Sequence, residues 1–111
     1  MSTYVNFVHR ATGPERVLKV LLDVGSDFAA SATNYWTFSL RRFATGSVYG
    51  ETIASYGLDV RSLTAFTPVV VYDDPRGFDL DDGDRLVLYA VSTGSPAVPT
   101  TPVFQTLVQG R

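Results

Sequence analysis

The sequence predicts an all-β fold: a single β-sandwich or jelly-roll-like domain of about seven or eight antiparallel strands. In several segments large apolar residues alternate with polar ones, which is the period of a strand with one buried face. Glycine and proline turn signals separate these segments at fairly even spacing. The length of 111 residues fits one domain. We therefore expect residues 14–111 to form the sandwich and residues 1–13 to be an extended N-terminal arm or first strand.

The N-terminal segment has two interpretations that the sequence leaves open. It is either an ordinary first strand or an arm that packs on a neighbouring subunit, since an apolar terminal segment needs something to cover it. The contacting residues of such an arm would be Tyr4, Val5, Phe7, Val8, His9 and Arg10.

Two segments show the clearest strand alternation. In Tyr35–Arg41 and Arg85–Val91, every second residue is large or apolar. The residues expected to face the core are Trp36, Phe38, Leu40, Leu86, Leu88 and Ala90. Tyr35 lies on the opposite face of its strand and is therefore a candidate interface residue.

The segment Arg16–Val24 is more uniformly apolar, so a helix competes with a strand there. Its valines and short length favour the strand, with Leu18, Val20, Leu22 and Val24 toward the core. Phe28–Ala32 could form one helical turn. The shorter predicted strands are Thr52–Tyr56, Leu63–Phe66, Val69–Tyr72 and Val103–Val108.

Composition argues against several classes of partner. The net charge is −2 and only Lys19 is a lysine, whereas nucleic-acid binding needs a basic face. The chain has no cysteine, which excludes disulfides and thiolate metal sites. Its N-terminus does not have the pattern of a secretory signal, and its apolar runs are too short to span a bilayer. We expect a soluble protein with no nucleic-acid, membrane or small-molecule partner.

Aspartates gather between Asp73 and Asp84, where turns are expected at Asp73–Gly77 and at Asp82-Gly83-Asp84. Clustered carboxylates could hold Ca²⁺, and Asp79, Asp81, Asp82 and Asp84 are the candidate ligands. The spacing departs from the helix–loop–helix calcium pattern, because Gly83 stands where a third ligand is needed. Aspartate is also a preferred turn residue, so turns with solvated carboxylates are the favoured interpretation.

The sequence contains no set of residues that is typical of a catalytic site. His9 is the single histidine, whereas a histidine-ligated metal site normally needs two or three and a catalytic triad needs a well-held one. No glycine-rich phosphate loop is present. We expect neither enzymatic activity nor a cofactor. An alternative function is carbohydrate binding, with Tyr35, Tyr49 or Tyr56 as a stacking platform.

Taken together, the order of features resembles small β-sandwich structural modules of tailed bacteriophages, above all capsid decoration (cement) proteins. The features are the apolar strand Arg16–Val24, the segment 32–42 around Asn34-Tyr35-Trp36-Thr37-Phe38, Thr52–Ser55, Phe78–Leu88, and Gly94-Ser95-Pro96-Ala97 before a last strand. The similarity covers about Arg16–Val108.

The resemblance implies a non-enzymatic virion protein that is made in the host cytoplasm and binds the outer surface of the capsid. It would clamp neighbouring subunits of the major capsid protein, as a homotrimer, through the N-terminal segment and loops at one end of the sandwich. Another virion part, such as a tail, neck or fibre module, is the alternative within the same class.

Overall fold

The computed structural model describes residues 3–111, and all the regular elements in this part of the chain are strands. None of the described residues belongs to a helix long and apolar enough to cross a membrane. The strands are β1 (Thr3–Arg10), β2 (Glu15–Asp23), β3 (Tyr35–Phe43), β4 (Gly50–Gly57), β5 (Val69–Leu80), β6 (Arg85–Thr93) and β7 (Val103–Gly110).

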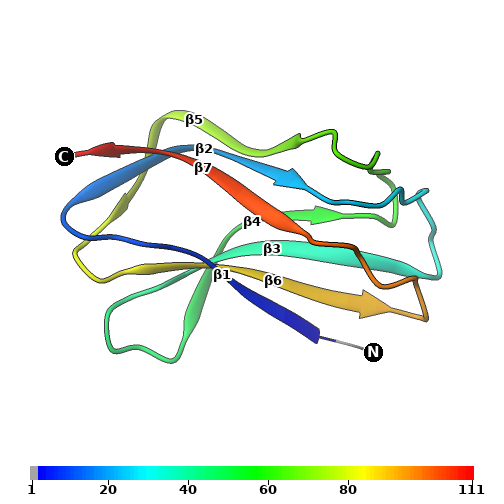
Figure 1. The fold of residues 1–111 in the computed structure, drawn as a ribbon. Coiled ribbons are helices and arrows are strands. Elements are labelled where there is room, and N and C mark those ends of the chain that lie inside the picture. Colours follow the sequence, from blue (N-terminus) through cyan, green and yellow to red (C-terminus); the bar gives the residue numbers. More distant parts are fainter. Residues whose placement is uncertain (1–2) are drawn as a thin grey trace.

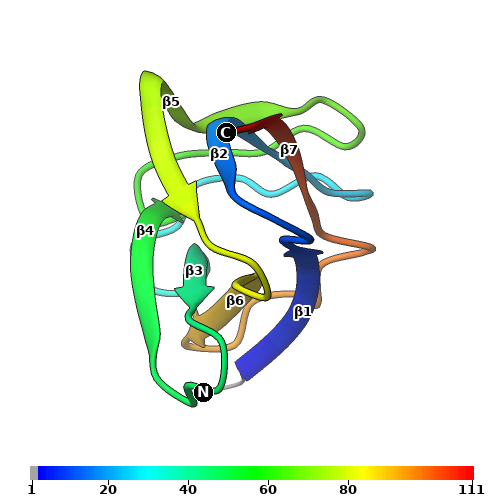
Figure 2. The same ribbon diagram turned by 90° about the vertical axis from the view of Figure 1, so that its left-hand side faces the viewer.

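The strands form two antiparallel sheets that pack face to face (Figure 1). The four-stranded sheet has the order β1-β6-β3-β4, and the three-stranded sheet has the order β5-β2-β7. Figure 2 shows the two layers, with β5, β2 and β7 above the other four strands. The predicted single all-β sandwich is confirmed.

The core lies between the sheets and is filled by alternate residues of the central strands. Phe38 and Leu40 of β3 and Leu86, Leu88 and Ala90 of β6 are fully buried. The inward residues predicted for these two strands are therefore confirmed.

Strand β2 departs from the predicted alternation. Val20 and Leu22 are buried as expected, but Val17 is buried as well, whereas Leu18 is only half-buried. The register of β2 against both its neighbours shifts between Val17 and Lys19. A bulge adds one residue and reverses the side-chain phase, so the prediction that Leu18 faces the core is wrong.

Other local predictions also fail. The segment Asp73–Gly77 lies inside β5, where the pairing with β2 jumps from Phe78 to Asp73, so it is a bulge within a strand rather than a turn between strands. Leu63–Phe66 is not a strand, because only Leu63 bridges to Phe28. Phe28–Ala32 forms no helical turn.

The loops differ between the two ends of the sandwich (Figure 1). At one end short connections join β1 to β2, β3 to β4 and β5 to β6. At the other end lie the three longer loops 24–34, 58–68 and 94–102, together called the long-loop end here. Strand β1 begins beside the long-loop end, since Thr3 and Tyr4 line a hollow with Ser95, Pro96 and Val98.

Candidate interaction surfaces

The long-loop end is held together by hydrogen bonds between its loops. Phe28 and Leu63 exchange two backbone bonds of 2.9 Å. The Gly25 amide donates to the Thr100 carbonyl at 2.7 Å, which joins the first loop to the third. These bonds connect the first loop to both the second and the third.

Side chains form further hydrogen bonds that connect the loops. The Asp27 carboxylate accepts a hydrogen bond from the Ala65 amide at 2.7 Å. The buried indole of Trp36 donates from Nε1 to the Ala97 carbonyl at 2.7 Å. The only tryptophan of the chain thus fills part of the core and also holds the third loop against it.

Phe66, in the second loop of the long-loop end, has both an exposed side chain and an unusual backbone conformation. Its side chain is 75% exposed and its φ is 59°, a left-handed backbone conformation that a bulky aromatic residue rarely adopts. A hydrogen bond of 2.8 Å from the Phe66 amide to the Val24 carbonyl holds it there. Strain that the surrounding structure maintains is typical of functional positions.

The surroundings of Phe66 are poor in charge. Asp27, Asp59 and Arg61 are the charged residues of the three long loops. Val60 and Val98 in the same loops are also exposed. Aromatic residues and depletion of charge mark the centres of protein interfaces, so this end has the chemistry of a protein-binding surface.

The second candidate surface is strand β1, and the structure divides the predicted N-terminal residues between two faces. Tyr4 and Val8 are half-buried and pack on the core. Val5 and Phe7 point outward and are 54% and 63% exposed. Residues 3–10 thus form the edge strand of a sheet, and the first two positions of the predicted segment 1–13 lie outside the described residues.

The remaining predicted contact residues occupy different positions. His9 lies 3.0 Å from Glu15, with its Nε2 against the carboxylate, across the turn between β1 and β2. Arg10 is exposed at the end of β1. Tyr35 is partly buried against the core at the start of β3, which leaves it less accessible than Val5 or Phe7.

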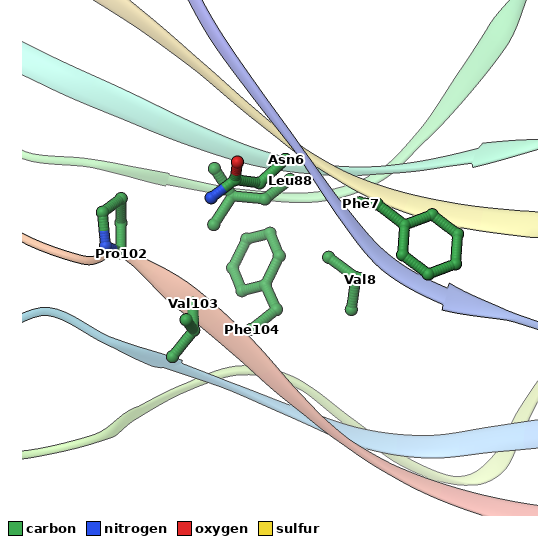
Figure 3. Close-up of a pocket in the computed structure, with 7 residues that line it drawn as sticks. All are labelled: Asn6, Phe7, Val8, Leu88, Pro102, Val103 and Phe104. Carbon is green, nitrogen blue, oxygen red and sulfur yellow. The ribbon is translucent and has the colours of Figure 1, made fainter.

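A groove separates β1 from β7 where the two sheets part at one side of the sandwich. Asn6, Val8, Leu88 and Phe104 line it, and Figure 3 shows the Phe7 ring on the opposite side of β1 from Val8 and Phe104. Along β7, Val103 and Leu107 are also exposed. The sequence signals a strand there but gives no sign that its apolar residues remain uncovered.

Two aspartates of the acidic segment, Asp79 and Asp81, form ion pairs with arginines. Asp79 binds Arg16 Nε at 3.0 Å and an Arg111 terminal nitrogen at 3.2 Å, and Arg111 also binds Asp81 at 2.9 Å. The hydrogen bond from Arg16 lowers the pKa of Asp79 below its usual range, and the charges of Arg111 and Arg42 act in the same direction. These carboxylates hold β5 to β2 and to the end of β7.

Asp84 has a separate structural role. Its buried carboxylate accepts hydrogen bonds from the amides of Asp81 and Thr45, at 2.9 and 3.2 Å. It therefore closes the predicted turn, in which Gly83 has a φ of 87°. Among residues 3–111, no three histidine, aspartate or glutamate side chains gather in a way that could hold a metal ion.

The three tyrosines considered for sugar stacking do not share a platform. Tyr35 and Tyr56 lie near the long-loop end and are partly buried. Tyr49 is 85% exposed and precedes Gly50, which pairs with Phe43 at the opposite end of β3. The geometry therefore offers no flat surface built from these residues together.

The comparisons with known proteins find no match among protein-family models, curated proteins or solved structures.

Proposed function

We propose that this protein is a non-enzymatic virion structural protein, a capsid decoration protein that binds the outer surface of the major capsid protein lattice. The observation that carries the proposal is the long-loop end, where Phe66 is exposed on loops that hydrogen bonds already order. An ordered aromatic side chain in a charge-poor surround is the usual form of an interface hot spot.

The start of β1 belongs to the same contact. Thr3 and Tyr4 adjoin Pro96 and Val98 of the third loop, so the N-terminal segment and the loops face a partner together. The resemblance implies a contact through the same two parts of the molecule. On a lattice with many identical sites, modest single contacts are sufficient, because avidity adds them. The protein then resides on the capsid surface after synthesis in the host cytoplasm.

The test uses heads assembled from the major capsid protein of the same genome. The purified protein is mixed with heads and sedimented, and the bound fraction gives the apparent Kd. Phe66→Asn removes the aromatic ring, and asparagine tolerates the left-handed backbone. We expect binding weaker by about 30-fold, the effect of losing a hot spot of about 2 kcal/mol.

Tyr49→Asn is the matched control, since Tyr49 is also a highly exposed aromatic residue and lies at the opposite end of the molecule. It should bind heads as the unmodified protein does. Failure of the unmodified protein to bind heads would overturn the proposal, and binding to isolated tails instead would move the protein to another part of the virion.

A further inference from the structure

The two sides of the sandwich differ in how their edge strands are protected. On one side, β4 contains Glu51 and β5 contains Asp73, Asp74 and Pro75. Charges, proline and bulges are the usual devices that prevent an edge strand from pairing with another chain. On the other side, β1 has a register shift between Phe7 and His9, but it is neutral from Thr3 to Val8 and contains neither glycine nor proline.

The side with the neutral segment of β1 also carries exposed apolar side chains. Val5 and Phe7 lie on β1, and Val103 and Leu107 lie on the adjacent edge strand β7. An edge with free backbone groups and apolar side chains is a template for another strand. The question is which strand the pattern of β1 fits.

The pattern fits a second β1 in antiparallel orientation. The basic residues His9 and Arg10 both lie at the C-terminal end of the strand. Antiparallel pairing places the two copies of these residues at opposite ends of the joint sheet, whereas parallel pairing would put like charges side by side. A pairing centred on Asn6 sets Val5 of each copy opposite Phe7 of the other, which gives two apolar cross-strand pairs.

We propose that β1 pairs with β1 of a second copy of this chain, about a two-fold axis at Asn6. Such an axis, normal to the sheet, keeps each face on its own side and joins the two four-stranded sheets of order β1-β6-β3-β4 into one continuous sheet. Strand β7 lies on the same side as β1, whereas its Leu107 lies on the outer face of the three-stranded sheet, beside Lys19 and Leu21.

The side that β1 and β7 share is large enough for a stable contact. The molecule is 41 Å long and measures 20 Å along its shortest dimension. A standard protein interface buries about 800 Å² per partner, and a side of this length allows contacts beyond the paired strands themselves. A two-fold contact is also the commonest symmetry of soluble oligomers.

The first test is the mass in solution by light scattering over a dilution series. The unmodified protein should form a dimer. Phe7→Lys adds a charge to the free edge and should raise the dissociation constant at least tenfold, whereas Val70→Lys changes a similarly exposed valine on the protected edge strand β5 and should not. Circular dichroism of both variants verifies that the sandwich is folded.

The second test maps the pairing. The chain has no cysteine, so Val5→Cys, Asn6→Cys and Phe7→Cys each introduce a single one. Residues opposite each other in an antiparallel pair have Cα atoms about 4.5–5.5 Å apart, within the range of a disulfide. Only the residue on the axis faces its own copy, so mild oxidation should link Asn6→Cys into dimers most readily.

A monomer at all concentrations, a three-fold assembly, or a series without cross-linking would overturn the pairing. The pairing goes beyond the proposed function and departs from the homotrimer that the resemblance implies, because a two-fold contact gives a dimer. Self-association is measured by light scattering in the absence of heads. Head binding by Phe66→Asn is measured at protein concentrations for which light scattering has already given the oligomeric state.

Discussion

At the scale of single residues, Phe66 combines an exposed ring with a left-handed backbone. The left-handed conformation costs an ordinary L-residue about 1–2 kcal/mol, less for asparagine and more for a β-branched residue. We therefore expect the free energy of unfolding of Phe66→Asn to be about 1 kcal/mol higher than that of Phe66→Val. Urea denaturation followed by Trp36 fluorescence measures both. Equal stability of the two variants would show that the backbone at this position is relaxed in solution.

Asp84 gives a second prediction at this scale. Its buried carboxylate satisfies the amides of Asp81 and Thr45, and Asp84→Ala would leave both without a partner. The expected loss in unfolding free energy is about 2–3 kcal/mol. Asp82→Ala, on an exposed neighbour, should change it by less than about 0.5 kcal/mol. Similar losses in the two variants would contradict a structural role for Asp84.

The same residues allow a test of calcium binding. Because the carboxylate of Asp84 is occupied by amides and those of Asp79 and Asp81 by arginines, excess Ca²⁺ should leave the Tm unchanged. Thermal unfolding with Ca²⁺ and with a chelator makes the comparison. A Tm that rises with Ca²⁺ in the unmodified protein, and not in Asp84→Ala, would restore the calcium site.

At the scale of strands, regular alternation made β3 and β6 predictable, because each sends every second side chain into the core without interruption. β2 and β5 were harder, since their register shifts depend on the partner strand and not on local sequence. The same composition that marks a turn, Asp73–Gly77, also marks a bulge in a long edge strand.

The candidate surfaces were predictable to a different degree. The alternation of the N-terminal segment already placed Val5 and Phe7 on one face, although only the fold shows that this face is the exposed one. Phe66 could not be found from the sequence, because its backbone conformation comes from a hydrogen bond to Val24 in another loop. Contacts between loops distant in the chain have no local signal.

Gly77 tests the bulge in β5. Its φ is +64° and a Cβ atom there would clash with the Val17 carbonyl oxygen. Gly77→Ala should therefore lower the unfolding free energy by about 2–4 kcal/mol, from backbone strain and overpacking together. Gly13→Ala is the control, because nothing lies within 4 Å of a Cβ atom at that position. A Gly77→Ala protein as stable as Gly13→Ala would mean that the bulge rearranges at little cost.

At the scale of the whole molecule, charge is distributed unevenly along the long axis. The long loops hold few ionised side chains, whereas Arg16, Arg42, Arg111, Asp79 and Asp81 gather near the other end. There Arg42 donates to the Asp79 backbone carbonyl at 2.9 Å, so Asp79 connects the two sheets. One end thus contains a network of ion pairs, whereas the long-loop end contains fewer charged side chains.

This polarity predicts how stability depends on pH. The pKa of Asp79 is lowered in the folded protein, first by the hydrogen bond from Arg16, so folding favours the ionised carboxylate. The stability that the ionised Asp79 carboxylate contributes is fully present above the pKa of an aspartate in the unfolded chain, about 3.9. It is lost as the pH falls through the lower pKa of Asp79 in the folded protein. The urea midpoint of the unmodified protein should therefore exceed that of Asp79→Asn at pH 6, and the difference should shrink toward pH 3.

In an Arg16→Gln background the same comparison should depend less on pH, because the main cause of the lowered pKa is gone. A difference that stays constant from pH 6 to pH 3 would show that Asp79 stabilises the sandwich by packing and not through its charge.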